Sequence, residues 1–232
     1  LVALGVSGAR RKASRGLDAA LLAAVATSLT SADDAVRAGA AYALFRQKAK
    51  ATEQALTTAF SSKDAQVRIF LARAAQHQEP ASAASLVDAG LADPDWRVRV
   101  EAVRAAAALG GPAAGLARVL EEAVAQIGAS PPTDHLAREV CLALASVSAA
   151  PAELAPRLRA AAAALSGKGA DHRAAACTCA AALDVIEPER GALIKCGATG
   201  SALARFDVER VARSRVSAKE RAAVFAQLLR SD

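Results

Sequence analysis

The 232-residue chain contains no methionine, one tryptophan, one tyrosine and five phenylalanines, so aromatic residues are only 3% of it. Its 53% hydrophobic content is therefore mostly alanine, with leucine and valine. Alanine is the best helix former and a poor strand former, which favours packed helices with close backbones over a sheet. The charged content of 22% and the mean hydropathy of +0.22 exclude an intrinsically disordered chain.

Features of membrane insertion and secretion are also missing. No run reaches the roughly 18 consecutive apolar residues of a membrane span, so we expect none. The apolar residues 1–8 precede the basic residues of segment 1–16, whereas a secretory signal has its basic residues first. Because there is no initiator methionine, we expect a processed chain or a fragment. The compartment, cytoplasmic or exported (periplasmic), stays open.

The net charge of +6 comes from 29 basic and 23 acidic residues. The excess is spread over both halves, so neither half is a basic module, and nucleic-acid binding is not the favoured interpretation. Residues 1–16 form a short basic segment, which we interpret as a solvated end or a landing point for phosphate or an acidic partner.

A repeated motif, Asp-x-x-(Val/Ala)-Arg, organises the chain. Successive arginines are 31, 31 and 39 residues apart, and small or apolar residues follow each arginine by three and seven positions, as on one buried helical face. Each aspartate is placed to cap a helix, and each arginine can reach its own aspartate or that of the next repeat. We interpret these eight residues as a structural ladder: Asp33, Arg37, Asp64, Arg68, Asp95, Arg99, Asp134 and Arg138.

We expect five helix pairs, the last a degenerate copy that begins at Asp171. The first helices are predicted at 17–30, 51–61, 80–92, 112–128 and 151–166. The second helices, which carry the motif, are predicted at 33–47, 64–77, 95–109, 133–149 and 170–186. The pattern stops after Pro188, and a capping box predicts a final helix over 218–230, with another before it. We therefore predict one domain, 1–232, with repeats over 17–186 and a C-terminal helical cap over 187–232.

The motif followed by alanines at helical spacing resembles the HEAT-repeat family, in particular the short bacterial HEAT-like repeats first named from phycobilisome lyases. The resemblance covers about residues 17–186, and three copies match well. It implies an all-α fold, a right-handed superhelical solenoid in which the second helices line a concave binding surface. Such repeats specify a fold and leave the function open.

Metal and cofactor chemistry is not indicated. The cysteines stand at 141, 177, 179 and 196, and neither they nor the three histidines have zinc-site spacing. Cys177 and Cys179 would point about 200° apart on a helix, so they cannot chelate one ion together. Two states stay open: a disulfide of Cys196 with Cys177 or Cys179, which would place the protein outside a reducing cytosol, or reduced, buried thiols.

Catalytic motifs are also missing, and we predict that the chain is not an enzyme. The alkylpurine DNA glycosylases, which have a HEAT-like fold, use a cleft with several aromatic residues, whereas Trp96 and Tyr42 are the only indole and phenol here. Residues 177–184 and 193–197 faintly resemble the end of HEAT domains beside cyclophilin-type peptidyl-prolyl isomerases. That resemblance implies a non-catalytic, substrate-holding part.

The favoured function is a scaffold that binds a protein or peptide along the concave face. The alternatives are an accessory domain of a larger enzyme and a nucleic-acid binder. Arg73 and Arg104 both lie five residues after a ladder arginine, so stacking should align them in a row suited to carboxylates and peptide carbonyls. The predicted binding residues are Arg73, Gln76, Glu101, Arg104 and Glu139.

Overall fold

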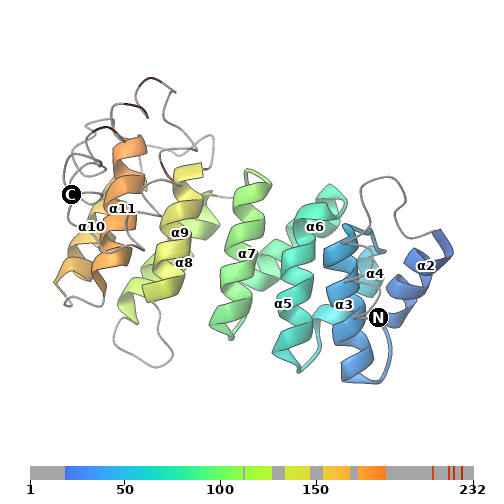
Figure 1. The fold of residues 1–232 in the computed structure, drawn as a ribbon. Coiled ribbons are helices and arrows are strands. Elements are labelled where there is room, and N and C mark those ends of the chain that lie inside the picture. Colours follow the sequence, from blue (N-terminus) through green and yellow to red (C-terminus); the bar gives the residue numbers. More distant parts are fainter. Residues whose placement is uncertain are drawn as a thin grey trace. The chain divides into compact units, whose positions relative to one another are not determined.

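The computed structural model (Figure 1) contains only helices as regular elements in the part of the chain that it describes, which confirms the all-α prediction. The chain divides into two compact units, Leu1–Leu109 and Gly110–Asp232. The described residues are 19–111, 113–126, 134–146, 154–167 and 172–186, together with Val211, Lys219, Ala222 and Ala226.

The first unit is built from three helix pairs. The first helices are α2 (Ala19–Ser28), α4 (Glu53–Phe60) and α6 (Pro80–Leu91). The second helices are α3 (Asp34–Gln47), α5 (Ala65–Ala74), which the 3-10 turn η1 (Ala75–His77) continues, and α7 (Trp96–Ala108). Within each pair the first helix packs on the second, and α3, α5 and α7 pack side by side (Figure 1). The unit therefore has two helical layers, and the motif helices form one of them.

The second unit repeats this arrangement with two helix pairs. Its helices are α8 (Ala113–Ala125), α9 (Asp134–Ser146), α10 (Leu154–Ser166) and α11 (Arg173–Ile186). Helix α8 packs on α9 and α10 packs on α11, while α9 packs beside α11 and α8 beside α10. The motif helices again share one layer.

The helices lie where the repeats place them, within about three residues at each end. The predicted helix 64–77 ends early as an α-helix, at Ala74, and continues as a 3-10 turn. The chain must become extended there because a residue that precedes a proline avoids the helical region, and Glu79, before Pro80, has φ −63° and ψ 150°. The basic segment 1–16 lies outside the described residues. So does the predicted cap 187–232, apart from four single residues, which are helical.

Helix starts follow the predicted capping chemistry in the first unit. Asp33, Asp64 and Asp95 are the N-caps of α3, α5 and α7, with extended backbones. Their carboxylates accept backbone N–H groups two residues further on, at 2.8, 2.8 and 2.9 Å. Asp134 is instead the first residue of α9. Each cap satisfies a donor that the helix leaves open and places a negative charge at the positive end of the helix.

The buried face predicted from the repeat is the core of both units. The residues three and seven positions after the arginines are all at most 1% exposed: Ala40, Leu44, Leu71, Ala75, Ala102, Ala106, Cys141 and Ala145. Alanine lets the helices approach closely. At Gly90 of α6, an added Cβ would lie only 2.7 Å from the Cβ of Ala102, so this contact between α6 and α7 requires glycine.

A disulfide joins Cys141 of α9 to Cys179 of α11, with the Cα atoms 4.9 Å apart. The predicted bond between Cys196 and Cys179 is therefore wrong, as is the reduced state for this pair, while Cys196 itself lies outside the described residues. The prediction assumed that the segment with Cys196 folds back onto the preceding helix. The actual partner is distant in sequence, because α9 and α11 occupy equivalent places in stacked pairs and pack side by side. Cys177 is buried on α11.

Candidate functional site

Two of the ladder arginines, Arg37 and Arg68, pair with other carboxylates than those predicted. Arg68 donates from Nε to Asp93 Oδ2 at 2.7 Å and from Nη2 to Oδ1 at 3.1 Å. This forked pair is largely buried and joins α5 to the turn before α7. The hydrogen bond that Arg68 donates to Asp93 raises the pKa of the Arg68 guanidinium. Arg37 pairs with Asp34 through Nη2 alone, within the first turn of α3, and the Asp34 side chain is exposed.

Asp33, Asp64 and Asp95 serve as caps in these turns, and Asp95 also accepts a forked bond from Arg97, two residues further on. The residue two positions before each cap also forms a hydrogen bond within the turn. The side chains of Ser31, Ser62 and Asp93 accept the backbone N–H of the cap residue, at 3.2, 3.2 and 2.8 Å. The arginines of the first two copies also donate to the carbonyls of Ser31 and Ser62. In the first three copies the full motif is therefore (Ser/Asp)-x-Asp-x-x-Val-Arg, and its first position is readable from the sequence.

The remaining ladder residues are also structural. Arg99 and Arg138 are 9% and 8% exposed. Arg138 Nη1 lies 3.2 Å from His135 Nδ1, and Nη2 lies 3.9 Å from Glu139 Oε1. In the same unit, Asp134 lies 4.0 Å from His172 Nδ1. The Arg138 contacts lie within α9, whereas the Asp134 contact reaches from α9 to the residue before α11. A partner would instead meet the exposed surface of the layer that the motif helices form.

That surface carries a cluster of arginines and aromatic rings in the first unit. Both Arg73 and Arg104 donate to Glu101 Oε1, at 2.8 and 2.9 Å, so one carboxylate holds two guanidinium groups. The Arg73 guanidinium also lies over the Phe45 ring, 5.8 Å from its centre. We call the following six residues the arginine–aromatic face: Tyr42, Phe45, Phe70, Arg73, Glu101 and Arg104.

Two aromatic residues extend the cluster along α3 and α5. The rings of Tyr42 and Phe70 meet edge to face, with centres 5.1 Å apart and planes at 65°. Tyr42, Phe45 and Phe70 are all half-buried. They were missed as site residues, although Tyr42 lies five residues after Arg37, which is the offset of Arg73 and Arg104 from their own ladder arginines. The repeat register therefore puts Tyr42, Arg73 and Arg104 in equivalent positions on adjacent helices.

The five predicted binding residues divide into two groups. Arg73 and Arg104 come together through Glu101 and keep 36% and 42% of their side chains exposed, and Gln76 is exposed and donates to the carbonyl of Arg73 at 3.3 Å. The two glutamates do not point outward as predicted. Glu101 is 8% exposed beneath its arginines, and Glu139 of the second unit is 2% exposed. Helix α9 is buried without a break over Leu136–Ala145, which leaves Glu139 inside.

Charge separates the two layers of the first unit. Helices α3, α5 and α7 contain seven arginines and two carboxylates. Helices α2, α4 and α6 contain two carboxylates, Glu53 and Asp88, and no lysine or arginine. The layer with the arginine–aromatic face is therefore basic, and the opposite layer is acidic.

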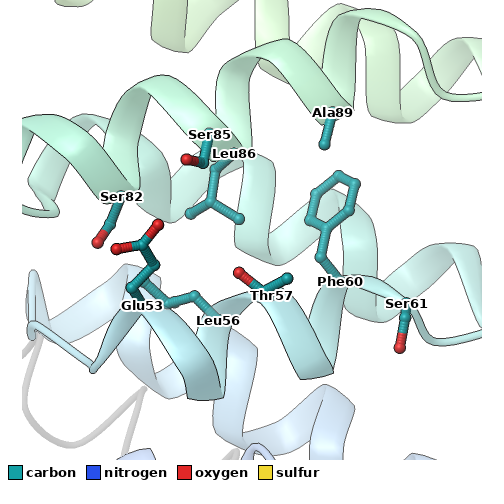
Figure 2. Close-up of a pocket in the computed structure, with 9 residues that line it drawn as sticks. All are labelled: Glu53, Leu56, Thr57, Phe60, Ser61, Ser82, Ser85, Leu86 and Ala89. Atoms are coloured by element: carbon teal, nitrogen blue, oxygen red, sulfur yellow. The ribbon is translucent and has the colours of Figure 1, made fainter.

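The acidic layer contains an apolar groove between α4 and α6, with a volume of about 260 Å³. Figure 2 shows Leu56 and Leu86 in the middle of the groove, Glu53 towards one end and Phe60 towards the other. The volume is just below the roughly 300–1,000 Å³ of pockets that hold drug-sized ligands. The complete lining is Glu53, Leu56, Thr57, Phe60, Ser61, Ser82, Ser85, Leu86 and Ala89.

No three histidine, cysteine or acidic side chains in the part of the chain that the structure describes gather as a metal site would require. None of the helices in that part of the chain combines the length and apolar character of a membrane span. In comparisons with known proteins, no family model matches the chain, and no curated protein gives a significant match.

Proposed function

We propose that the chain is a non-catalytic HEAT-like scaffold that binds an acidic protein or peptide segment on its arginine–aromatic face. The observation that carries this proposal is the pairing of two half-exposed arginines with one buried carboxylate beside three half-buried aromatic rings. Arginine and large aromatic residues dominate the binding energy of protein interfaces. In this proposal the helix pairs continue into a right-handed superhelix, and α3, α5 and α7 line its concave side.

The charges favour an acidic partner. Glu101 neutralises one of the two arginines that it holds, so the cluster keeps a net positive charge. A guanidinium has five N–H donors in a planar fork, and the Arg73 bond to Glu101 uses one nitrogen. A carboxylate of the partner can therefore bind in a forked manner beside Glu101.

Preorganisation supports the same proposal. Phe45 and Glu101 fix the Arg73 side chain from two directions before any partner arrives. Ordering a long, flexible side chain on binding costs about 0.5–1.5 kcal/mol, and a side chain already held in place avoids most of that cost. The adjacent Tyr42 and Phe70 rings supply apolar area for a neighbouring side chain of the partner.

The two alternatives make different use of this face. As an accessory domain of a larger enzyme, such as a peptidyl-prolyl isomerase, the chain would hold an acidic substrate segment in the same way. A nucleic-acid binder would instead place phosphates on Arg73 and Arg104, and its affinity would fall steeply with added salt. The alternatives therefore separate by ligand class.

The test is selection of peptides from a displayed random library on the full chain, followed by affinity measurements. Reversal of both arginine charges would group three carboxylates and destabilise the fold, so a neutral variant is cleaner. The triple substitution Arg73→Gln, Glu101→Gln and Arg104→Gln should lower affinity for the selected peptides at least tenfold and leave the melting temperature nearly unchanged.

The matched control changes an exposed ion pair of the same unit, Lys50→Gln with Glu79→Gln. This control should bind the selected peptides as the native chain does. Equal affinity in the triple variant would show that the arginine–aromatic face is not the binding site. Stronger binding to duplex DNA than to any peptide, lost in the triple variant, would favour the nucleic-acid alternative.

A further inference from the structure

We infer that the groove between α4 and α6 is a second docking site, which takes one apolar side chain of a partner segment that carries lysine or arginine next to it. This site lies on the opposite layer from the arginine–aromatic face and has the opposite charge. The inference does not depend on the proposed function.

The interior of the groove fits an apolar side chain. Leu56 and Leu86, at 1% and 3% exposure, form its floor, and Thr57, Phe60 and Ala89 form its walls (Figure 2). A groove of about 260 Å³ between two helices admits a phenylalanine or leucine side chain and is too small for most cofactors. Burial of such a side chain gains about 25 cal/mol for each Å² removed from water.

The rim of the groove selects the charge of the partner. Glu53 is exposed in the first turn of α4, and it has no ion-pair partner among the described residues. Lys50, a lysine close to Glu53 in the sequence, is paired with Glu79. Glu53 is the one charged residue in the lining of the groove. Asp88, on α6 outside that lining, is the only other charged residue of α4 and α6, and it is also negative. A basic residue beside the apolar anchor would therefore be attracted, and an acidic one repelled.

Hydroxyl groups complete the recognition chemistry. Thr57 and Ser85 are exposed on facing sides of the groove, one on each helix. Each hydroxyl can donate and accept, so together they can bind the backbone N–H and C=O of a segment whose side chain enters the groove. An apolar interior with a few polar groups at the rim is the usual composition of a specific peptide pocket.

The test uses two synthetic peptides and the full chain labelled with ¹⁵N. One peptide is Gly-Ser-Lys-Phe-Lys-Ser-Gly, and the other has glutamate in place of both lysines. We expect the basic peptide to shift amide signals of α4 and α6 in a saturable manner and the acidic peptide to leave them unshifted. Equal shifts with both peptides, or shifts confined to other helices, would overturn the inference.

Two variants of α6 locate the site. Ala89 lines the groove and is exposed, so Ala89→Trp should fill it without disturbing the core and abolish the shifts. Ala84 is exposed on the same helix outside the groove, and Ala84→Trp should leave the shifts intact. Equal loss in both variants would overturn the inference.

The charge of the rim is tested separately. Glu53→Gln should lower the affinity for the basic peptide by up to about fivefold, as expected for the loss of one exposed ion pair. An unchanged affinity would remove the selectivity for basic partners. Sedimentation of the chain without peptide gives a last outcome: self-association that Ala89→Trp abolishes would mean that a second copy occupies the groove, against the inference.

Discussion

The two units differ in one of the links that join successive helix pairs, because only the second unit contains cysteines. In the first unit the links are polar: Arg68 with Asp93, Arg73 with Glu101, and Gln78, whose side chain binds the backbone of Ala49 and Ala51. In the second unit a disulfide joins the motif helices, beside an ion pair of Arg157 on α10 with Glu121 on α8. Cys141 occupies the repeat position that Ala40, Leu71 and Ala102 hold in the first unit. The difference shows that the repeat fixes which helices meet, whereas the chemistry of the link is interchangeable.

The largest expected effect comes from removal of the covalent link. A disulfide that closes a loop of 38 residues should contribute about 4 kcal/mol, mainly by restricting the unfolded chain. Cys141→Ala with Cys179→Ala should therefore destabilise the second unit by that amount and leave amide exchange in α3, α5 and α7 unchanged. Calorimetry and hydrogen exchange measure both effects. An equal loss of protection in both units would contradict the comparison.

The next effect comes from the buried polar link. Asp93→Ala leaves the Arg68 guanidinium largely buried without its carboxylate, and loss of one partner of a buried pair costs about 3 kcal/mol. We expect that loss in the first unit, measured by urea unfolding. The control Lys50→Gln breaks an exposed pair, so it should change the free energy of unfolding by less than about 1 kcal/mol. A similar loss in both variants would show that burial is not the deciding factor.

A smaller effect tests the close packing that both units share. Ala102→Leu, opposite Gly90, and Ala105→Leu should each destabilise by about 1–3 kcal/mol, because the added carbons do not fit between the helices. The same substitution at exposed Ala108 of α7 is the control and should be nearly neutral. Thermal melts of the three variants give the comparison, and unchanged melting in all three would show that the register is wrong.

The smallest effect is a pH dependence in the first unit. Burial, and then the positive charge of Lys48, lower the pKa of His77 below its ordinary 6.5. The folded state therefore resists protonation, and the unfolded state binds more protons as the pH falls. The stability contribution of neutral His77 is full above about pH 7 and is lost as the pH drops through 6.5 towards the folded pKa. Urea unfolding at several pH values should show that the free energy of unfolding depends less on pH in His77→Gln than in the native chain.

The local and periodic features were predictable from the sequence, and the long-range partners were not. Asp64 as a cap and Ala102 as a core residue follow from spacing alone, because helical geometry repeats every 3.6 residues. The pairing of Arg68 with Asp93 depends on how the turn before α7 places Asp93 beside α5, and spacing alone does not give that placement. The bond between Cys141 and Cys179 required knowledge of which helices stack.

The candidate site was predictable in part for the same reason. Arg73 and Arg104 were found from their equal offsets, and their common contact with Glu101 follows the stacking of α5 on α7. The contribution of Phe45 was not predictable from the sequence, because it depends on how the Arg73 side chain folds back over the neighbouring helix. Glu139 was misplaced because α9 is buried on more sides than its equivalents.

The disulfide also determines how the second unit would respond to a pulling force. The covalent loop from Cys141 to Cys179 encloses all of α10, so tension enters at α9 and leaves at α11 through two sulfur atoms. The sequence separation of 38 between the two cysteines, at roughly 3.5 Å per residue, removes about 130 Å from the length to which the oxidised chain can be drawn out. Reduction would return that length, so the oxidation state sets the chain's extensibility as well as its stability.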